Sequence, residues 1–235
     1  MAKRDLHGVG ERKIYDFLGE LEAELEMDLP FYPEVYWVGR NADFGALAKL
    51  GLSKEEVGEK NSRISYFVPS KRTVLLRNLD QEDMAEEAGH FVHWTLTPTK
   101  FPEKLNRRNV FLLMFSEAIG YFCSKLIVPE RRNTFQGYKD LLLLPEEEAV
   151  LYIAKVFNVG KVHLLNFLKY QQGYTLGEKM FRAYNRHEIG PKDIVSLMKA
   201  NISESEAIPF FMGLRQKFWP FDLNAAIKRM NIQLQ

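Results

Sequence analysis

Cysteine is almost absent from this chain: Cys123 is the one cysteine among 235 residues. An internal disulfide is therefore excluded, and we expect a cytoplasmic protein, since disulfide-rich chains belong to oxidising compartments. One-sided charge is missing as well: 32 Lys and Arg residues stand against 31 Asp and Glu residues. This balance argues against a nucleic-acid partner, because a phosphate backbone is recognised by a strongly basic surface.

Long apolar runs are also missing. The charged N-terminal residues 1–5 lead into no apolar signal region. The most apolar run, residues 110–115, is interrupted by Ser116 and Glu117, so we expect no membrane span. Apolar residues nevertheless make up 46% of the chain, which is enough for a folded core. Many Lys and Glu residues together with a single Cys are typical of a thermophile.

Hydrophobic periodicity predicts an α+β fold whose strands all precede residue 80. Helical spacing predicts helices over residues 11–27, 80–95, 108–126, 145–157, 161–170, 177–184, 191–200 and 203–218. β-rich runs predict strands at 35–38, 63–68 and 73–77, with a turn at 69–72 that makes the last two a hairpin. We expect a small three-stranded sheet with an active-site helix in a domain over residues 1–130. A mostly helical extension would follow over residues 131–235.

The strongest chemical signal is the segment 84–93, which reads MAEEAGHFVH. Glu86, His90 and His93 stand at i, i+4 and i+7, so a helix places them on one face, and Glu87 lies beside that row. Zinc hydrolysis needs three protein ligands, an open position for water, and a carboxylate that accepts the proton of the water. The spacing and residue types of this helix therefore predict a metal site.

Glu117 is a further candidate ligand, because it lies in an otherwise apolar predicted helix. It is the only acidic residue between Arg107 and Lys125. A carboxylate buried in such a helix costs free energy unless it is paired or binds a metal. Glu117 is therefore more informative than an acidic residue on a solvated face.

Three segments in the same order resemble the ImmA/IrrE-type peptidase domain, a minimal gluzincin-like metallopeptidase. Segment 84–93 departs from the family motif HExGHxxH at one ligand position, where Glu86 replaces a His. Segment 116–129, SEAIGYFCSKLIVP, resembles the family's glutamate helix with its apolar-apolar-Pro turn. Segment 153–162, IAKVFNVGKV, is similar to a helix-turn-helix-like element expected near residues 147–170. The resemblance extends from about residue 64 to residue 169.

The resemblance implies a metallopeptidase-like hydrolase that acts on proteins or peptides through metal-activated water. Glu86, His90 and Glu117 would hold the metal, His93 would be a spare ligand, and Glu87 would be the general base. Two carboxylates and one imidazole suit Mn²⁺ or Fe²⁺ as well as Zn²⁺. The degenerate motif also implies an alternative, namely a catalytically inactive zincin relative that serves as a protein-interaction or regulatory module; the motif also leaves open that no metal is bound.

Other interpretations of the same helices stay open. Acidic residues 82–87 suit a solvated first helical turn, with His90 and His93 as hydrogen-bonded core residues. A di-iron bundle would need a second E-x-x-H motif, which the sequence does not contain. The helix-turn-helix-like segment has a mostly apolar second helix, which favours packing over DNA recognition.

Three further features are expected to be structural. Residues 130–132 are expected to form a solvated helix end. The aromatic residues between 210 and 221 are expected to form core or a homodimer contact. Cys123 is expected to be a buried small apolar residue.

Overall fold

The computed structural model describes residues 3–38, 65–99, 110–132 and 161–219. The chain forms two compact units, and each unit combines segments that are far apart in the sequence. The first unit comprises Met1–Pro98, Ile119–Arg131 and Ile189–Ala200, and the second comprises Thr99–Ala118, Arg132–Glu188 and Asn201–Gln235. The division into domains at residue 130 stays a prediction.

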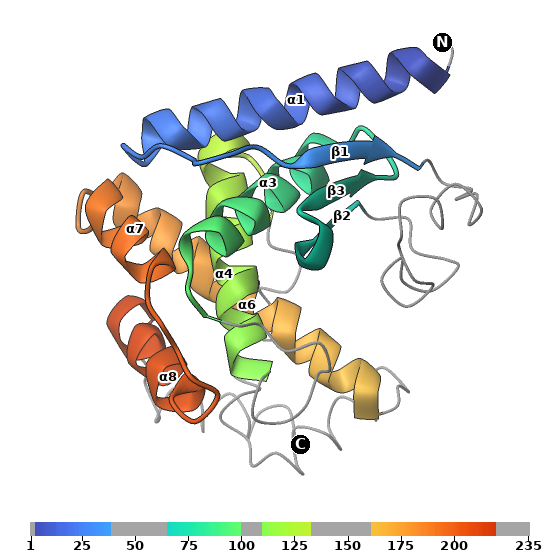
Figure 1. Cartoon of the computed structure of the whole chain (residues 1–235). Coiled ribbons are helices and arrows are strands. Elements are labelled where there is room, and N and C mark those ends of the chain that lie inside the picture. The colour runs from blue at the N-terminus through green and yellow to red at the C-terminus, as the bar shows by residue number, and fades with distance from the viewer. Residues whose placement is uncertain (1–2, 39–64, 100–109, 133–160, 220–235) are drawn as a thin grey trace. The chain divides into compact units, whose positions relative to one another are not determined.

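Helix α1 (Lys3–Glu24) packs on the sheet and on helix α3 of the first unit (Figure 1). Its apolar row is buried, because Ile14, Leu18 and Leu21 are all 0% exposed. The helix begins earlier than the apolar spacing predicts. Gly10 lies in this extra part, and a Cβ there would come within 2.4 Å of the Leu76 side chain. The missing side chain therefore lets the helix approach the sheet closely.

The sheet has three short strands in the order β1-β3-β2 (Figure 1). Strand β1 (Glu34–Trp37) runs parallel to β3 (Thr73–Leu76), and β2 (Tyr66–Val68) runs antiparallel to it. The short 3-10 turn η1 (Pro69–Lys71) joins β2 to β3, which confirms the predicted hairpin. All residues of the central strand are buried.

Helix α3 (Gln81–Leu96) follows the sheet directly and begins at its predicted cap. The Asp80 carboxylate accepts hydrogen bonds from the amides of Glu82 and Asp83, at 2.9 and 3.1 Å. These bonds satisfy amides that have no partner within the helix. Helix α3 packs on α1 and β2, and nearly all of its residues from 84 to 93 are buried.

Helix α4 (Val110–Ile127) runs through the boundary between the units at residues 118 and 119. Among the described residues it is the one helix long and apolar enough to cross a membrane, although most of that stretch is buried inside the protein. The helix continues through Ser116 and Glu117, as the predicted helix over residues 108–126 requires. Cys123 is fully buried, as predicted, and burial raises the pKa of its thiol above the ordinary value.

Helix α6 (Lys161–Asn185) is a single long helix, although the sequence predicts separate helices over residues 161–170 and 177–184. Residues 147–160 of the expected helix-turn-helix-like segment lie outside the described residues. Helix α7 (Pro191–Met198) packs on α3 in the first unit, and helix α8 (Ala207–Phe218) packs on α6 in the second.

The C-terminal aromatic residues include core residues of the second unit. The rings of Phe210 and Phe115 meet edge to face at 5.0 Å, and those of Phe211 and Phe111 at 5.9 Å. Both pairs connect α8 to the first half of α4. The core prediction is therefore confirmed for Phe211, which is fully buried, whereas Phe210 is only partly buried.

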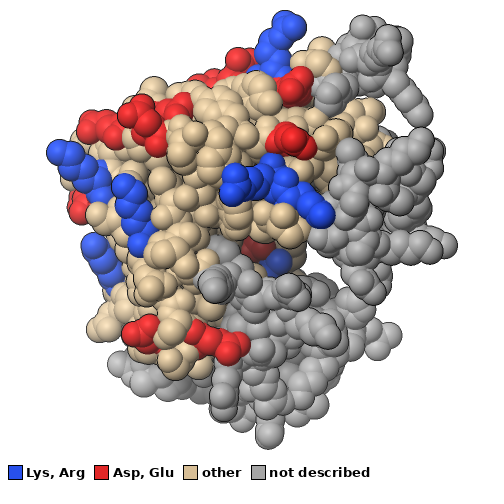
Figure 2. Space-filling model, viewed as in Figure 1, with Lys and Arg blue, Asp and Glu red and all other residues tan. Residues whose placement is uncertain are grey.

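The described chain is thus a mixed α/β fold with a small three-stranded sheet and mostly helical content, as the sequence predicts. Lys and Arg side chains are interspersed with Asp and Glu on the face shown in Figure 2. The described part of this face therefore has no extended surface of one sign, in keeping with the balanced composition.

Candidate metal centre

The close approach of helices α3 and α4 depends on two glycines. A Cβ on Gly89 would come within 2.6 Å of the Cys123 Cβ and 3.0 Å of the Gly120 carbonyl oxygen. A Cβ on Gly120 would come within 2.6 to 2.9 Å of three atoms of the His90 ring. The imidazole of His90 therefore lies in the space that a side chain at residue 120 would fill.

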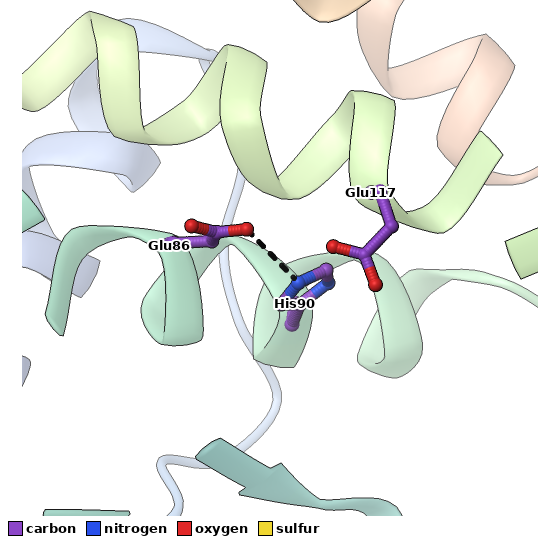
Figure 3. Close-up of side chains that lie close together, drawn as sticks. All are labelled: Glu86, His90 and Glu117. Atoms are coloured by element: carbon purple, nitrogen blue, oxygen red, sulfur yellow. Dashed lines mark ion pairs between the residues drawn. The ribbon is translucent and has the colours of Figure 1, made fainter. Parts of the chain in front are cut away.

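Glu117 lies one turn before Gly120 on the same continuous helix. Its carboxylate, that of Glu86 and the imidazole of His90 offer ligand atoms that all lie within 4.8 Å of one another (Figure 3). His90 Nε2 lies 3.8 Å from Oε1 of Glu86. Ligand atoms on one tetrahedral zinc ion are about 3.4 Å apart, so modest side-chain movements would bring this group to ligating distance. The structure thus brings together three of the four predicted ligands.

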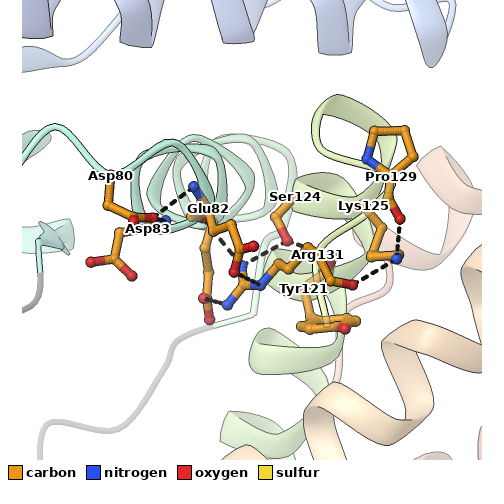
Figure 4. A network of polar contacts seen from close by, with 9 residues as sticks. Asp80, Glu82, Asp83, Tyr121, Ser124, Lys125, Pro129 and Arg131 are labelled. Atoms are coloured by element: carbon orange, nitrogen blue, oxygen red, sulfur yellow. Dashed lines mark hydrogen bonds and ion pairs between the residues drawn. The ribbon is translucent and has the colours of Figure 1, made fainter. Parts of the chain in front are cut away.

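Glu86 is already ion-paired with Arg131. Arg131 lies in the turn that follows α4 (Figure 4). The buried ammonium of Lys125 donates to the carbonyl oxygens of Pro129 and Arg131, and so closes that turn. The Arg131 guanidinium also donates to Ser124 Oγ at 2.7 Å. Arg131 is only 7% exposed, so the prediction of a solvated helix end at residues 130–132 is wrong for this residue.

Further contacts hold Arg131 in place. Its guanidinium donates to the carbonyl oxygen of Glu82 at 3.2 Å and lies 4.9 Å from the centre of the Tyr121 ring. Arginine suits such a site, because its planar fork donates in several directions and stacks on aromatic faces. Arg131 thus connects the first turns of α3 to the last turns of α4.

Glu117 is ion-paired with a second cation, Lys169 of helix α6, at 2.8 Å between Oε1 and Nζ. A Cβ on Gly173, one turn after Lys169, would come within 2.5 Å of the Glu117 Cβ, so a glycine again allows two helices to approach. Burial lowers the pKa of Lys169, but interactions with the Glu117 carboxylate and the Tyr170 side chain together outweigh burial, and the pKa lies above its ordinary value. Lys169 is therefore protonated at neutral pH.

Glu87 is buried and lies outside the three-residue group. Its carboxylate accepts a hydrogen bond from the backbone amide of Phe67 in β2, which is an edge strand of the sheet. The helix therefore directs Glu86 toward α4 and ties Glu87 to the sheet.

His93 is fully buried and also lies outside the three-residue group. Burial, together with repulsion from His90, lowers its pKa to about 3. His93 is therefore neutral over the physiological pH range.

Sequence reasoning missed Arg131 and Lys169 as members of this cluster. Lys169 carries the same signal that identified Glu117, because each is a charged residue in a mostly apolar stretch of helix. Arg131 carries no such signal, because it follows Pro129 in a charged segment. The fold of the turn alone brings it to Glu86.

No protein-family model, curated protein or solved structure matches this chain. The likeness to ImmA/IrrE-type peptidases therefore stays a prediction that rests on segments 84–93, 116–129 and 153–162. Residues 153–160 of the last segment lie outside the described residues. Segments 84–93 and 116–129 contain the three candidate ligands, so their geometry bears on function.

Proposed function

We propose that the protein is a divalent-metal-binding, metallopeptidase-like hydrolase that acts on proteins or peptides. Glu86, His90 and Glu117 would hold the metal. The observation that carries the proposal is the convergence of their ligand atoms within 4.8 Å, from two helices that glycines bring close together. A zincin-like fold, with α3 as its active-site helix, is part of the same proposal.

The donor set indicates which ions would fit. Two carboxylates and one imidazole supply two oxygen atoms and one nitrogen atom, which suit Mn²⁺ and Fe²⁺ as well as Zn²⁺. When bound, such an ion polarises a carbonyl group and lowers the pKa of a bound water. The seating of His90 against Gly120 supports the proposal, because it fixes the one nitrogen ligand before any ion arrives.

Glu87 is the residue that we propose as proton acceptor. It is the carboxylate next to Glu86 on the same helix, and the amide of Phe67 holds it in place. It would accept a proton from the attacking water and pass it to the leaving amine. Because the Glu87 carboxylate is already held by this hydrogen bond, less structural reorganisation would be needed for the proton transfer.

A second candidate function is favoured by the two ion pairs. Arg131 neutralises Glu86 and Lys169 neutralises Glu117, so the buried carboxylates are compensated without a metal. A descendant of a peptidase that has lost its metal would keep such pairs as structural contacts. Its function would then be to bind a protein partner.

Elemental analysis of the intact, untagged protein after incubation with Zn²⁺, Mn²⁺ or Fe²⁺ tests the proposal. We expect about one equivalent of metal in the wild type and a loss of that metal in Glu117→Ala. Glu178→Ala is the matched control, because Glu178 is also a largely buried helical carboxylate with an ion pair, to Arg182 at 3.0 Å. Metal content that is equal in both variants, or absent from the wild type, contradicts the proposal.

Glu86→His separates the two candidates further. It restores the ligand that the related motif has, so under the metal proposal zinc binding should tighten and peptide hydrolysis should rise. An unchanged affinity for zinc favours the metal-free alternative.

A further inference from the structure

The two cations of the cluster differ in how firmly they are held. Arg131 has four partners besides its ion pair with Glu86: the Ser124 hydroxyl, the backbone carbonyl and the carboxylate of Glu82, and the Tyr121 ring. Among the described residues, Lys169 contacts the Glu117 carboxylate and the side chain of its neighbour Tyr170. Arg131 is therefore a structural anchor, whereas Lys169 depends on one carboxylate.

The charges of the cluster balance before any metal binds. In the two close ion pairs, Glu86 and Glu117 contribute two negative charges, and Arg131 and Lys169 contribute two positive charges. The Glu82 carboxylate also lies 3.9 Å from Arg131, but it is about half exposed, so water screens its charge. A divalent ion on the same carboxylates would leave an excess of two positive charges in a largely buried group, where repulsion is screened far less than in water. One of the two cations must therefore move away when a metal enters.

Lys169 is the cation that can leave. Its compact ammonium sits on a flexible four-carbon stem, whereas the fork of Arg131 is fixed by several donors. Its side chain is 14% exposed, compared with 7% for Arg131, so Lys169 is the less completely buried of the two cations.

We propose that Lys169 is a resident cation of the candidate metal centre, which competes with a divalent ion for Glu117 and thereby sets the metal affinity. This inference rests on the proposed function and adds a residue that determines when the site fills. Without metal, Lys169 holds the Glu117 carboxylate in a low-energy pair. When a divalent ion binds, the ammonium gives up this carboxylate to the ion and turns to solvent.

Metal affinities of the intact chain test the proposal. Dissociation constants for Zn²⁺ and Mn²⁺ would be measured by competition with a chromophoric chelator, for the wild type, Lys169→Met and Lys169→Arg. We expect Lys169→Met to bind at least about tenfold more tightly, because the competing charge is gone, and Lys169→Arg to show no such gain. Lys192→Met is the matched control, because Lys192 is an exposed helical lysine in α7, and it should bind like the wild type.

The outcomes separate this proposal from the function on which it rests. If Lys169→Met binds no more tightly than the wild type while Glu117→Gln loses the metal, the resident-cation proposal is wrong and the metal site stands. If Lys169→Met binds metal and the wild type does not, the resident cation is supported and the native protein is the metal-free relative. If no variant binds either ion, both proposals are wrong.

A second measurement, on the wild type, tests the resident-cation proposal if Lys169→Met does not fold. Acetylation of lysines, followed by mass spectrometry, would report the reactivity of Lys169 relative to Lys192 without metal and with saturating Zn²⁺. We expect Lys169 to react several-fold faster with metal, because the ammonium has left Glu117. Unchanged relative reactivity overturns the proposal.

Discussion

The imidazole of His90 lies against the Cα of Gly120, where a Cβ would come within 2.6 Å of the ring. The same helix crossing brings Gly89 against Cys123 and the backbone of residue 120. One glycine thus seats a candidate ligand, and the other sets the distance between the two helices. The two positions should respond differently to the same substitution.

Gly120→Ala should impair metal binding more than stability. The new methyl group would push the His90 ring, which can turn away, so we expect a loss of metal affinity of about tenfold or more with less than about 1.5 kcal/mol of destabilisation. Gly89→Ala should instead cost about 1–3 kcal/mol, because its methyl group meets the Cβ of Cys123 and the backbone of Gly120, neither of which can turn away. Chelator competition and denaturant unfolding would measure the two quantities.

Gly19→Ala in α1 is the control, since a Cβ there meets nothing within 4 Å. It should stabilise the protein by about 0.5–1 kcal/mol and leave metal affinity unchanged. A Gly120→Ala variant with wild-type metal affinity would show that the seat of His90 is irrelevant to the site.

Arg131→Met should strongly destabilise the protein. Glu86 would be left as a buried carboxylate without its strongest partner, and breaking a buried pair in this way costs about 3–5 kcal/mol. Arg132→Met is the matched control, because the neighbouring Arg132 is exposed and should change stability by less than about 0.5 kcal/mol. Urea unfolding at neutral pH would compare them.

The double variant Arg131→Met with Glu86→Gln should recover part of that loss, since it removes both members of the pair. Equal stabilities for Arg131→Met and Arg132→Met would mean that the pair contributes nothing.

The stability of the protein should depend on pH through His93. Its pKa is lowered to about 3 in the folded protein from 6.5, so between these pH values the unfolded chain binds a proton that the folded protein does not. The contribution of His93 is therefore complete above pH 6.5 and falls as the pH decreases below it, by up to about 1.4 kcal/mol per pH unit. His93→Gln should show a shallower decline of unfolding free energy between about pH 6.5 and pH 4. Parallel pH profiles for the two proteins would contradict the assignment.

Local signals in the sequence predicted much of the fold. Asp80 caps α3 because its carboxylate satisfies amides two and three residues away, a relation that the sequence contains completely. The hairpin of β2 and β3 follows from two β-rich runs around a proline-containing turn. Glu117 was found because a charge in an apolar helix requires a partner.

The misses have equally specific causes. Residues 3–10, by which α1 extends beyond its predicted start, have no apolar row of their own. The close approach of Gly10 to the sheet is a tertiary contact, which the local sequence does not reveal. Helix α6 continues through Gly173 and Gly177, where helix propensity alone predicts weak points. At residue 173 the absent side chain makes room for Glu117, so packing outweighs propensity.

By itself, the sequence determined the α+β class, the capped helix α3, and the helical row that presents Glu86 and His90 on one face, because these depend on residues within a few positions of one another. Only the tertiary structure decided that Glu117 completes the group, that Glu87 is tied to an edge strand, and that Arg131 and Lys169 neutralise the two candidate ligands. Those relations join residues that are tens of positions apart. The distances between these residues follow from how closely the helices pack. That packing depends on Gly89, Gly120 and Gly173, which lie where helices approach one another.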